Sequence, residues 1–184
     1  MLWWTCLRVF ESPTVGAPDP IISVCERPPN HLTLPVEAKS IIGEPFDSLT
    51  LPDRFERGDV LVVCHDKSTV MGYTWLAFKD LWVSEARLFL LLSDDEATTY
   101  DAFVFPQYRG RKLYTRIESA ALAEAGMRGR KRAFTFVESY NTNSLKTQFR
   151  LGKTQVMSVY SIHLMDRFSL HWSTGLPLAS RFHK

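Results

Sequence analysis

The spacing of apolar and polar positions changes several times along the chain, and these changes predict most of its elements. Short apolar runs flanked by glycine, proline or polar turns are typical of β-strands. The runs of this kind lie at 2–10, 21–26, 60–64, 70–78, 87–92 and 98–105. The turn His65-Asp66-Lys67-Ser68 joins two of them, so we expect 60–64 and 70–78 to pair as a hairpin.

Apolar residues recur every four positions between Arg111 and Gly126, which predicts a helix there, with Gly126 ending it. The residues of its apolar face are Leu113, Ile117, Ala121 and Ala125, with Ala120 beside them. The segment 36–57 is less regular, and two short helices are expected in it, near 36–42 and 47–57.

A second long helix is expected over 142–151, because Asn141 can cap its start and Gly152 can end it. Between the two helices, 133–138 is predicted to be a strand. Residues 154–165 alternate between apolar and polar, as one or two final strands would.

This order of elements contains one strand–helix–strand crossover, over 98–138, which implies one parallel pair of strands. The expected fold class is α/β of the α+β type, with a mixed, mostly antiparallel central sheet of six or seven strands flanked by helices. We expect a single domain over 1–184, with an N-terminal strand and linker at 1–19, a core at 20–165 and a tail at 166–184. A crevice should open where the parallel neighbours part.

Composition excludes several classes of protein. The apolar fraction of 45% and charged fraction of 23% are those of a globular protein, and a net charge of +2 does not suggest a nucleic-acid partner. The three cysteines have no CxxC spacing, and no two histidines are four residues apart, so we expect no metal site. The longest apolar run after the N-terminus, 88–92, is far too short to cross a membrane. We therefore expect a cytoplasmic protein without a membrane partner.

The most informative stretch runs from Val104 to Tyr114, at the expected crevice. A strand ends at Pro106, and a cationic loop without acidic residues leads into the helix; its basic residues are Arg109, Arg111, Lys112 and Arg116. The first N–H groups of a helix are unpaired and favour an anion, and Gly110 allows close approach to the backbone. The loop can therefore bind a phosphate, or it can be an ordinary loop with solvated charges.

Three motifs resemble those of the GNAT superfamily of acyl-CoA-dependent N-acetyltransferases. Val104-x-Pro106-x-Tyr108-Arg109-Gly110-Arg111 is similar to the pyrophosphate loop, with Gln107 and Gly110 in its Q/R-x-x-G portion. Asn141-x-x-Ser144 followed by Leu151-Gly152 is similar to the N-x-x-A/S…LG helix. Val70-Met71-Gly72-Tyr73 is like the V-x-G-Y strand. The resemblance covers roughly residues 56–157.

The resemblance implies a sheet splayed between 98–105 and 133–138, with acetyl-CoA or another acyl-CoA bound in the splay as cosubstrate and no metal. It implies an N-acetyltransferase that moves acetyl to a primary amine, on a small molecule or a peptide, by direct attack in a ternary complex. The cofactor-binding residues that it implies are Phe103, Val104 and Phe105 for the pantetheine arm, Gln107 and the backbone of Arg109, Gly110, Arg111, Lys112 and Leu113 for the pyrophosphate, and Asn141 and Ser144 on the opposite side.

The chain departs from the family pattern at three positions. Lys112 stands where the family has Gly or Ala, and Lys153 replaces an aromatic residue. Gln148 stands where the family has the tyrosine that protonates the thiol, and Gln cannot do this, so that role is vacant or has moved. These departures motivate an alternative, a GNAT-fold module that binds CoA or a partner with weak or no catalysis.

Transfer to an amine that arrives protonated requires a base. Glu138, where one strand ends, and Asp101 on its neighbour are the candidates; Glu138 could instead cap the following helix or pair with Arg150, and Asp101 could pair with an arginine. Tyr140 and Tyr114 are the nearest phenols that could supply the missing acid, or else packing residues.

Three other features each have two interpretations, and the C-terminal tail has one. The basic group at 128–132 could contact the 3′-phosphate of the nucleotide or be a solvated loop, and the acidic run 94–96 could attract a cationic amine or be a solvated turn. Trp75, Phe78 and Trp82 could form the floor of an acceptor pocket or belong to the core. The apolar tail at 171–176 could pack on a partner, as in a homodimer.

Overall fold

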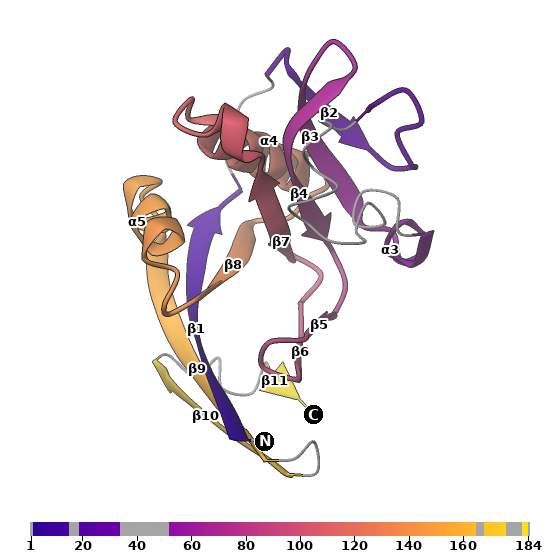
Figure 1. The fold of residues 1–184 in the computed structure, drawn as a ribbon. Coiled ribbons are helices and arrows are strands. Elements are labelled where there is room, and N and C mark those ends of the chain that lie inside the picture. Colours follow the sequence, from indigo (N-terminus) through magenta and orange to yellow (C-terminus); the bar gives the residue numbers. More distant parts are fainter. Residues whose placement is uncertain (1, 15–18, 34–51, 165–167, 176–181, 184) are drawn as a thin grey trace.

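The computed structural model describes residues 2–14, 19–33, 52–164, 168–175 and 182–183. The expected helix near 36–42, and the first part of the one near 47–57, lie outside the described residues. The elements, in chain order, are β1 (Leu2–Pro13), β2 (Ile22–Cys25), α3 (Pro52–Arg57), β3 (Val60–Asp66), β4 (Thr69–Ala77), β5 (Leu81–Val83), β6 (Leu88–Leu90), β7 (Glu96–Val104), a 3-10 turn (Pro106–Tyr108), α4 (Leu113–Met127), β8 (Arg132–Glu138), α5 (Thr142–Arg150), β9 (Thr154–Leu164), β10 (Phe168–Gly175) and β11 (Phe182–His183) (Figure 1).

The described strands form one large mixed sheet and one small sheet. The large sheet has eight strands in the order β10-β9-β1-β8-β7-β4-β3-β2, and its one parallel pair is β7 with β8. This confirms the expected mixed, mostly antiparallel sheet with one parallel pair. It has more strands than expected because β10 joins it within the segment predicted to be a tail. The run at 87–92 gives only β6, which lies in the small sheet β11-β6-β5.

β1 lies inside the large sheet, between β8 and β9. Leu7 is opposite Glu138 on one side and Val159 on the other, so the two partners of β1 come from the far end of the sequence. Near the middle of β1, side chains on both faces of the strand are buried: Leu7, Val9 and Phe10 are almost fully inaccessible to solvent. In Figure 1, β1, β9 and β10 run together along one side of the molecule. The N-terminal strand is therefore a central element of the sheet.

α4 packs on β3 and β4 and forms the main core with them. The five residues predicted to form its apolar face are all buried, and they contact Val60, Val62 and Leu76 of the sheet. The alanines on this face let the helix approach the sheet closely. α4 begins at Leu113, later than expected, because Lys112 adopts a left-handed conformation with φ of 57°. None of the helices among the described residues has the length and apolar character needed to span a membrane.

Gly126 does not end α4, which continues to Met127. Its role is packing, because a Cβ at this position would lie 2.6 Å from the carbonyl oxygen of Thr14. That segment is itself fixed by a hydrogen bond from Thr14 N–H to the carbonyl of Lys131. The glycine therefore lets the chain after β1 cross directly over the last turn of α4.

We expect Gly126→Ala to destabilise the protein by about 1–3 kcal/mol, because overpacking against a fixed carbonyl outweighs the better helix propensity of alanine. The measurement is the free energy of unfolding from urea denaturation. Met127→Ala is the control, since Met127 is 72% exposed in the same turn and should change stability by less than about 0.5 kcal/mol. Equal stability of Gly126→Ala and the parent protein would contradict this packing role.

Candidate functional site

The parallel pair β7–β8 separates halfway along its length. The two strands pair over four positions, from Glu96 opposite Arg132 to Thr99 opposite Thr135. Beyond Thr99, β7 continues with β4 as its neighbour, while β8 continues to Glu138 beside β1. An irregularity in the β4–β7 register accompanies the separation, and within it Asp101 has a φ of 50°. Such bulges bend a strand and redirect its side chains.

A cavity of about 590 Å³ lies at this separation. One wall is formed by the second half of β7, another by the end of β8, and a third by α5. Eight of the residues predicted as candidates for the site line it: Asp101, Phe103, Val104, Arg109, Tyr114, Glu138, Asn141 and Ser144. The other predicted residues do not belong to its lining, and they are Phe105, Gln107, Gly110, Arg111, Lys112, Leu113 and Tyr140.

The loop after β7 forms a tight cationic turn, and its first residue after the 3-10 turn, Arg109, lines the cavity. Gly110 and Lys112 both have positive φ, 79° and 57°. Among the described residues, the N–H groups from Gly110 to Leu113 have no backbone acceptor. Successive free N–H groups in such a turn form a concave site for an anion. Arg109 adds a guanidinium, which is held by a 3.0 Å hydrogen bond from its Nε to the carbonyl oxygen of Val104.

Two main-chain groups assigned to the cofactor are already used within the protein. The N–H of Arg109 donates to the carbonyl of Pro106 at 3.1 Å, which closes the 3-10 turn. The N–H of Phe105 donates to the carbonyl of Met71 at 3.1 Å, and its side chain is fully buried. The free amides of the loop therefore begin at Gly110, one residue later than the sequence suggested.

Asn141 caps α5 as predicted. Its side-chain oxygen accepts a 3.1 Å hydrogen bond from the N–H of Ser144. Because Asn141 and Ser144 also line the cavity, the cap fixes the start of α5 against the crevice.

We expect Asn141→Ala to lower the free energy of unfolding by about 1 kcal/mol, because one N–H at the helix start loses its acceptor. Asn141→Asp is the matched control, since a carboxylate caps a helix equally well. Chemical denaturation of both variants measures the difference. Equal losses in the two variants would show that the cap is not the source of the effect.

Glu138 and Asp101 occupy different environments in the cavity wall. The carboxylate of Glu138 accepts a hydrogen bond from the hydroxyl of Tyr140, and this bond raises the pKa of Tyr140 above its usual value. Asp101 forms an ion pair with Arg54 of α3 at 2.7 Å, so its charge is already compensated. Tyr140 itself is 76% exposed and lies outside the cavity lining. Of the two carboxylates predicted as candidate bases, Asp101 is therefore the one already held by an ion pair.

Tyr114, on the first turn of α4, lies in the cavity next to Gln148 of α5. The side-chain Nε2 of Gln148 donates a 2.8 Å hydrogen bond to the hydroxyl oxygen of Tyr114, and both residues line the cavity. Burial raises the pKa of Tyr114 well above its usual value, so the phenol is protonated at neutral pH. Gln148, which stands where a tyrosine was expected, thus contacts a tyrosine from another helix.

The basic group 128–132 and the acidic run 94–96 lie at the opposite end of β7 and β8 from the cavity. They pair with each other: Arg132 contacts Glu96 at 2.7 Å, and Lys131 contacts Asp95 at 3.6 Å. Both groups lie at the start of the strands, and neither contributes to the lining of the cavity. Trp75 is fully buried, and none of the three aromatic residues considered for a pocket floor lines the cavity.

No cluster of three or more potential metal ligands occurs among the described histidines, cysteines, aspartates and glutamates. Cys6, Cys25 and Cys64 are free thiols.

Solved structures of GNAT proteins have a similar fold. A GNAT-family protein from Novosphingobium aromaticivorans has a TM-score of 0.59 at 14% identity, over 86% of this chain and 63% of its own. An acetyltransferase of the GNAT family from Colwellia psychrerythraea has a TM-score of 0.55 at 16% identity, over 88% of this chain and 55% of its own. An N-acetyltransferase from Sphaerobacter thermophilus has a TM-score of 0.51 at 13% identity, over 94% of this chain and 53% of its own.

The chain therefore has the GNAT fold, as its motifs implied. It spans between 53% and 63% of the length of these three proteins. No protein-family model matches the chain, and no curated protein matches its sequence.

Proposed function

We propose that this protein is an acyl-CoA-dependent N-acyltransferase, in its simplest form an N-acetyltransferase that moves acetyl from acetyl-CoA to a primary amine. The observation that carries the proposal is the crevice between β7 and β8, which opens beside a turn of free N–H groups. An acyl-CoA matches both features, because its thioester arm would lie in the crevice and its pyrophosphate would bind the N–H groups of the turn. The acceptor is an amine on a small molecule or a peptide, and it attacks the thioester directly.

The loop from Gly110 to Leu113 would hold the pyrophosphate. Its free N–H groups and the neighbouring Arg109 supply hydrogen-bond donors and positive charge. The exposed side chain of Lys112 adds a further cation to this turn. Lys112 therefore suits a phosphate ligand even though it stands in place of a small residue.

The edge of β7 that faces the crevice would bind the pantetheine arm and polarise the thioester. Past Thr99 this edge is separated from β8, so its main-chain groups are available to a ligand. A fixed N–H directed at the thioester oxygen would stabilise the negative charge that develops as the amine attacks. Phe103 and Val104 lie on this part of the wall.

Glu138 would act as the base. The amine nitrogen forms a bond to the carbonyl carbon, Glu138 accepts a proton from that nitrogen, and the carbon–sulfur bond breaks. The end of β8 brings its carboxylate to the cavity wall opposite β7. Asp101 is less suited to this role because Arg54 already pairs with it.

We expect Gly110→Ala to weaken acetyl-CoA binding about tenfold, which corresponds to about 1.4 kcal/mol. Alanine strains the left-handed turn, so the loop turns its N–H groups away from the ligand. Gly129→Ala is the matched control, because Gly129 has nearly the same φ, 78° against 79°, and equally open space around a Cβ, but lies at the far end of the strands. Isothermal titration calorimetry gives both affinities, and equal weakening in both variants would contradict the proposed phosphate site.

We expect Glu138→Gln to lower turnover at least about tenfold near neutral pH while acetyl-CoA affinity is retained, as for a lost general base. Release of free thiol in the presence of a panel of amines measures turnover, and Glu56→Gln on the exposed surface of α3 is the control. Unchanged turnover would show that Glu138 is not the general base. Tight acetyl-CoA binding by the parent protein without amine-stimulated thiol release would instead favour the non-catalytic binding module.

A further inference from the structure

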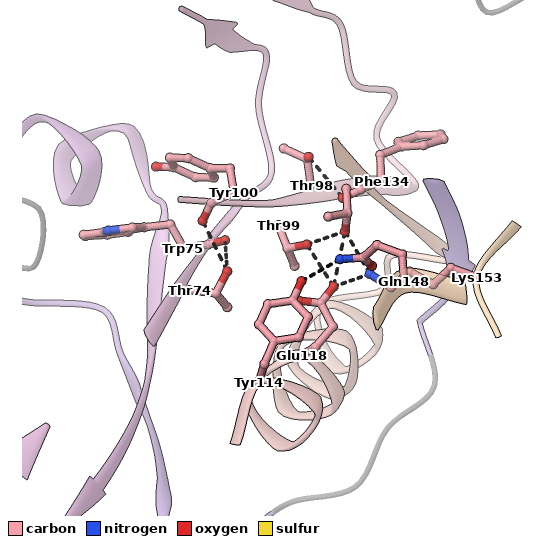
Figure 2. Close-up of polar contacts among 11 residues, drawn as sticks. Thr74, Trp75, Thr98, Thr99, Tyr100, Tyr114, Glu118, Phe134, Gln148 and Lys153 are labelled. Atoms are coloured by element: carbon pink, nitrogen blue, oxygen red, sulfur yellow. Dashed lines mark hydrogen bonds and ion pairs between the residues drawn. The ribbon is translucent and has the colours of Figure 1, made fainter. Parts of the chain in front are cut away.

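We propose that Tyr114 is the acid that protonates the departing thiolate, and that Gln148 and the buried Glu118–Lys153 pair hold it in position. This inference rests on the proposed acyl transfer. Figure 2 shows the residues concerned: Tyr114 and Glu118 from α4, Gln148 from α5, and Lys153, which follows α5.

The proposed transfer is faster with such an acid. Breaking the carbon–sulfur bond leaves an alkyl thiolate, which is a basic leaving group, since a free alkyl thiol has a pKa of about 8.5. A proton donor within reach of the sulfur makes its departure easier. In the proposed step the O–H bond of Tyr114 breaks and an S–H bond forms, while Glu138 keeps the proton from the amine. Water then carries that proton from Glu138 to the tyrosinate, which restores both groups.

The direction of the hydrogen bond between Gln148 and Tyr114 suits a phenol that acts as an acid. Nε2 of Gln148 donates to the phenol oxygen at 2.8 Å, so the phenol hydrogen is not used in this bond. The side chain of Gln148 is held firmly, because the residue is only 1% exposed. A donor at this position also stabilises the tyrosinate that forms after proton transfer. Gln148 thus acts through Tyr114. It stands where the family has a tyrosine, and its side chain hydrogen-bonds the tyrosine that we propose takes over the role.

A buried ionic cluster lies beneath this pair. Lys153 Nζ contacts Glu118 Oε1, and the exposed fractions of the two side chains are 1% and 0%. Thr99 Oγ1 donates to the same carboxylate oxygen at 3.0 Å, and Thr135 Oγ1 donates to it at 3.2 Å. These two threonines form the last position at which β7 and β8 pair. The cluster therefore fixes α4 to the point at which β7 and β8 stop pairing and the crevice begins.

The charges of this cluster also act on the phenol. The negative charge of Glu118 is among the causes that raise the pKa of Tyr114, after burial. Lys153 compensates that charge, and without it an uncompensated carboxylate would oppose formation of the tyrosinate. A hydrogen bond from the phenol to the Glu118 carboxylate is a further cause that raises the pKa of Tyr114. Lys153 is thus a positioning residue that makes proton release from Tyr114 easier.

The test compares Tyr114→Phe with Tyr160→Phe, a control that removes a hydroxyl on β9, outside the cavity lining. Tyr114→Phe should lower kcat about a hundredfold or more while acetyl-CoA affinity stays within about twofold, because only the proton donor is lost. Gln148→Met should lower kcat by a smaller factor, since the phenol remains. Full kcat in Tyr114→Phe would overturn the inference.

The pKa of the thiol of bound CoA is a second readout, which a purely structural role would not change. It is measured from the ultraviolet absorption of the thiolate in the CoA complex. A phenol that donates to sulfur stabilises the thiolate, so this pKa should rise in Tyr114→Phe and stay unchanged in Tyr160→Phe. An unchanged thiol pKa in Tyr114→Phe would also overturn the inference. Absence of turnover in the parent protein would contradict the proposed function instead, and the titration would still report on Tyr114.

Discussion

The structure depends on the point at which β7 and β8 stop pairing. Thr99 and Thr135 form the last pair, and their hydroxyls both bond the buried carboxylate of Glu118. A carboxylate in the core is stable only when it is paired and hydrogen-bonded, and Lys153 supplies the opposite charge. The cluster joins α4, both strands and the segment after α5 at one place. The cavity opens directly beyond it.

Each of the two separated strands keeps a partner on its outer side. β8 pairs with β1 over seven positions, and β7 pairs with β4. The loss of hydrogen bonds between β7 and β8 is therefore confined to the edges that face the crevice. Those edges, with the N–H groups from Gly110 to Leu113, carry the main-chain donors and acceptors that we propose bind an extended ligand with a phosphate group. The insertion of β1 is thus part of what keeps the crevice open.

Local signals in the sequence predicted local structure well. The four-residue spacing of α4 and the cap at Asn141 were confirmed, because both depend on residues within one or two helical turns. The place of β1 was missed, because it depends on pairing with residues more than 100 positions away. Lys153 was missed as a buried residue, since only its contact with Glu118, 35 positions earlier, makes burial possible. The one available signal was Glu118 itself, beside Ile117 in the apolar stripe of α4.

Hydrogen–deuterium exchange with and without acetyl-CoA reports on the main-chain amides proposed to bind the ligand, and it therefore tests the cofactor site between β7 and β8. Slower exchange is expected in peptides covering 100–105 and 109–114, and at the start of α5, with no change at 128–132. Protection at 128–132, or none at 109–114, in a protein saturated with acetyl-CoA would contradict a cofactor site between β7 and β8.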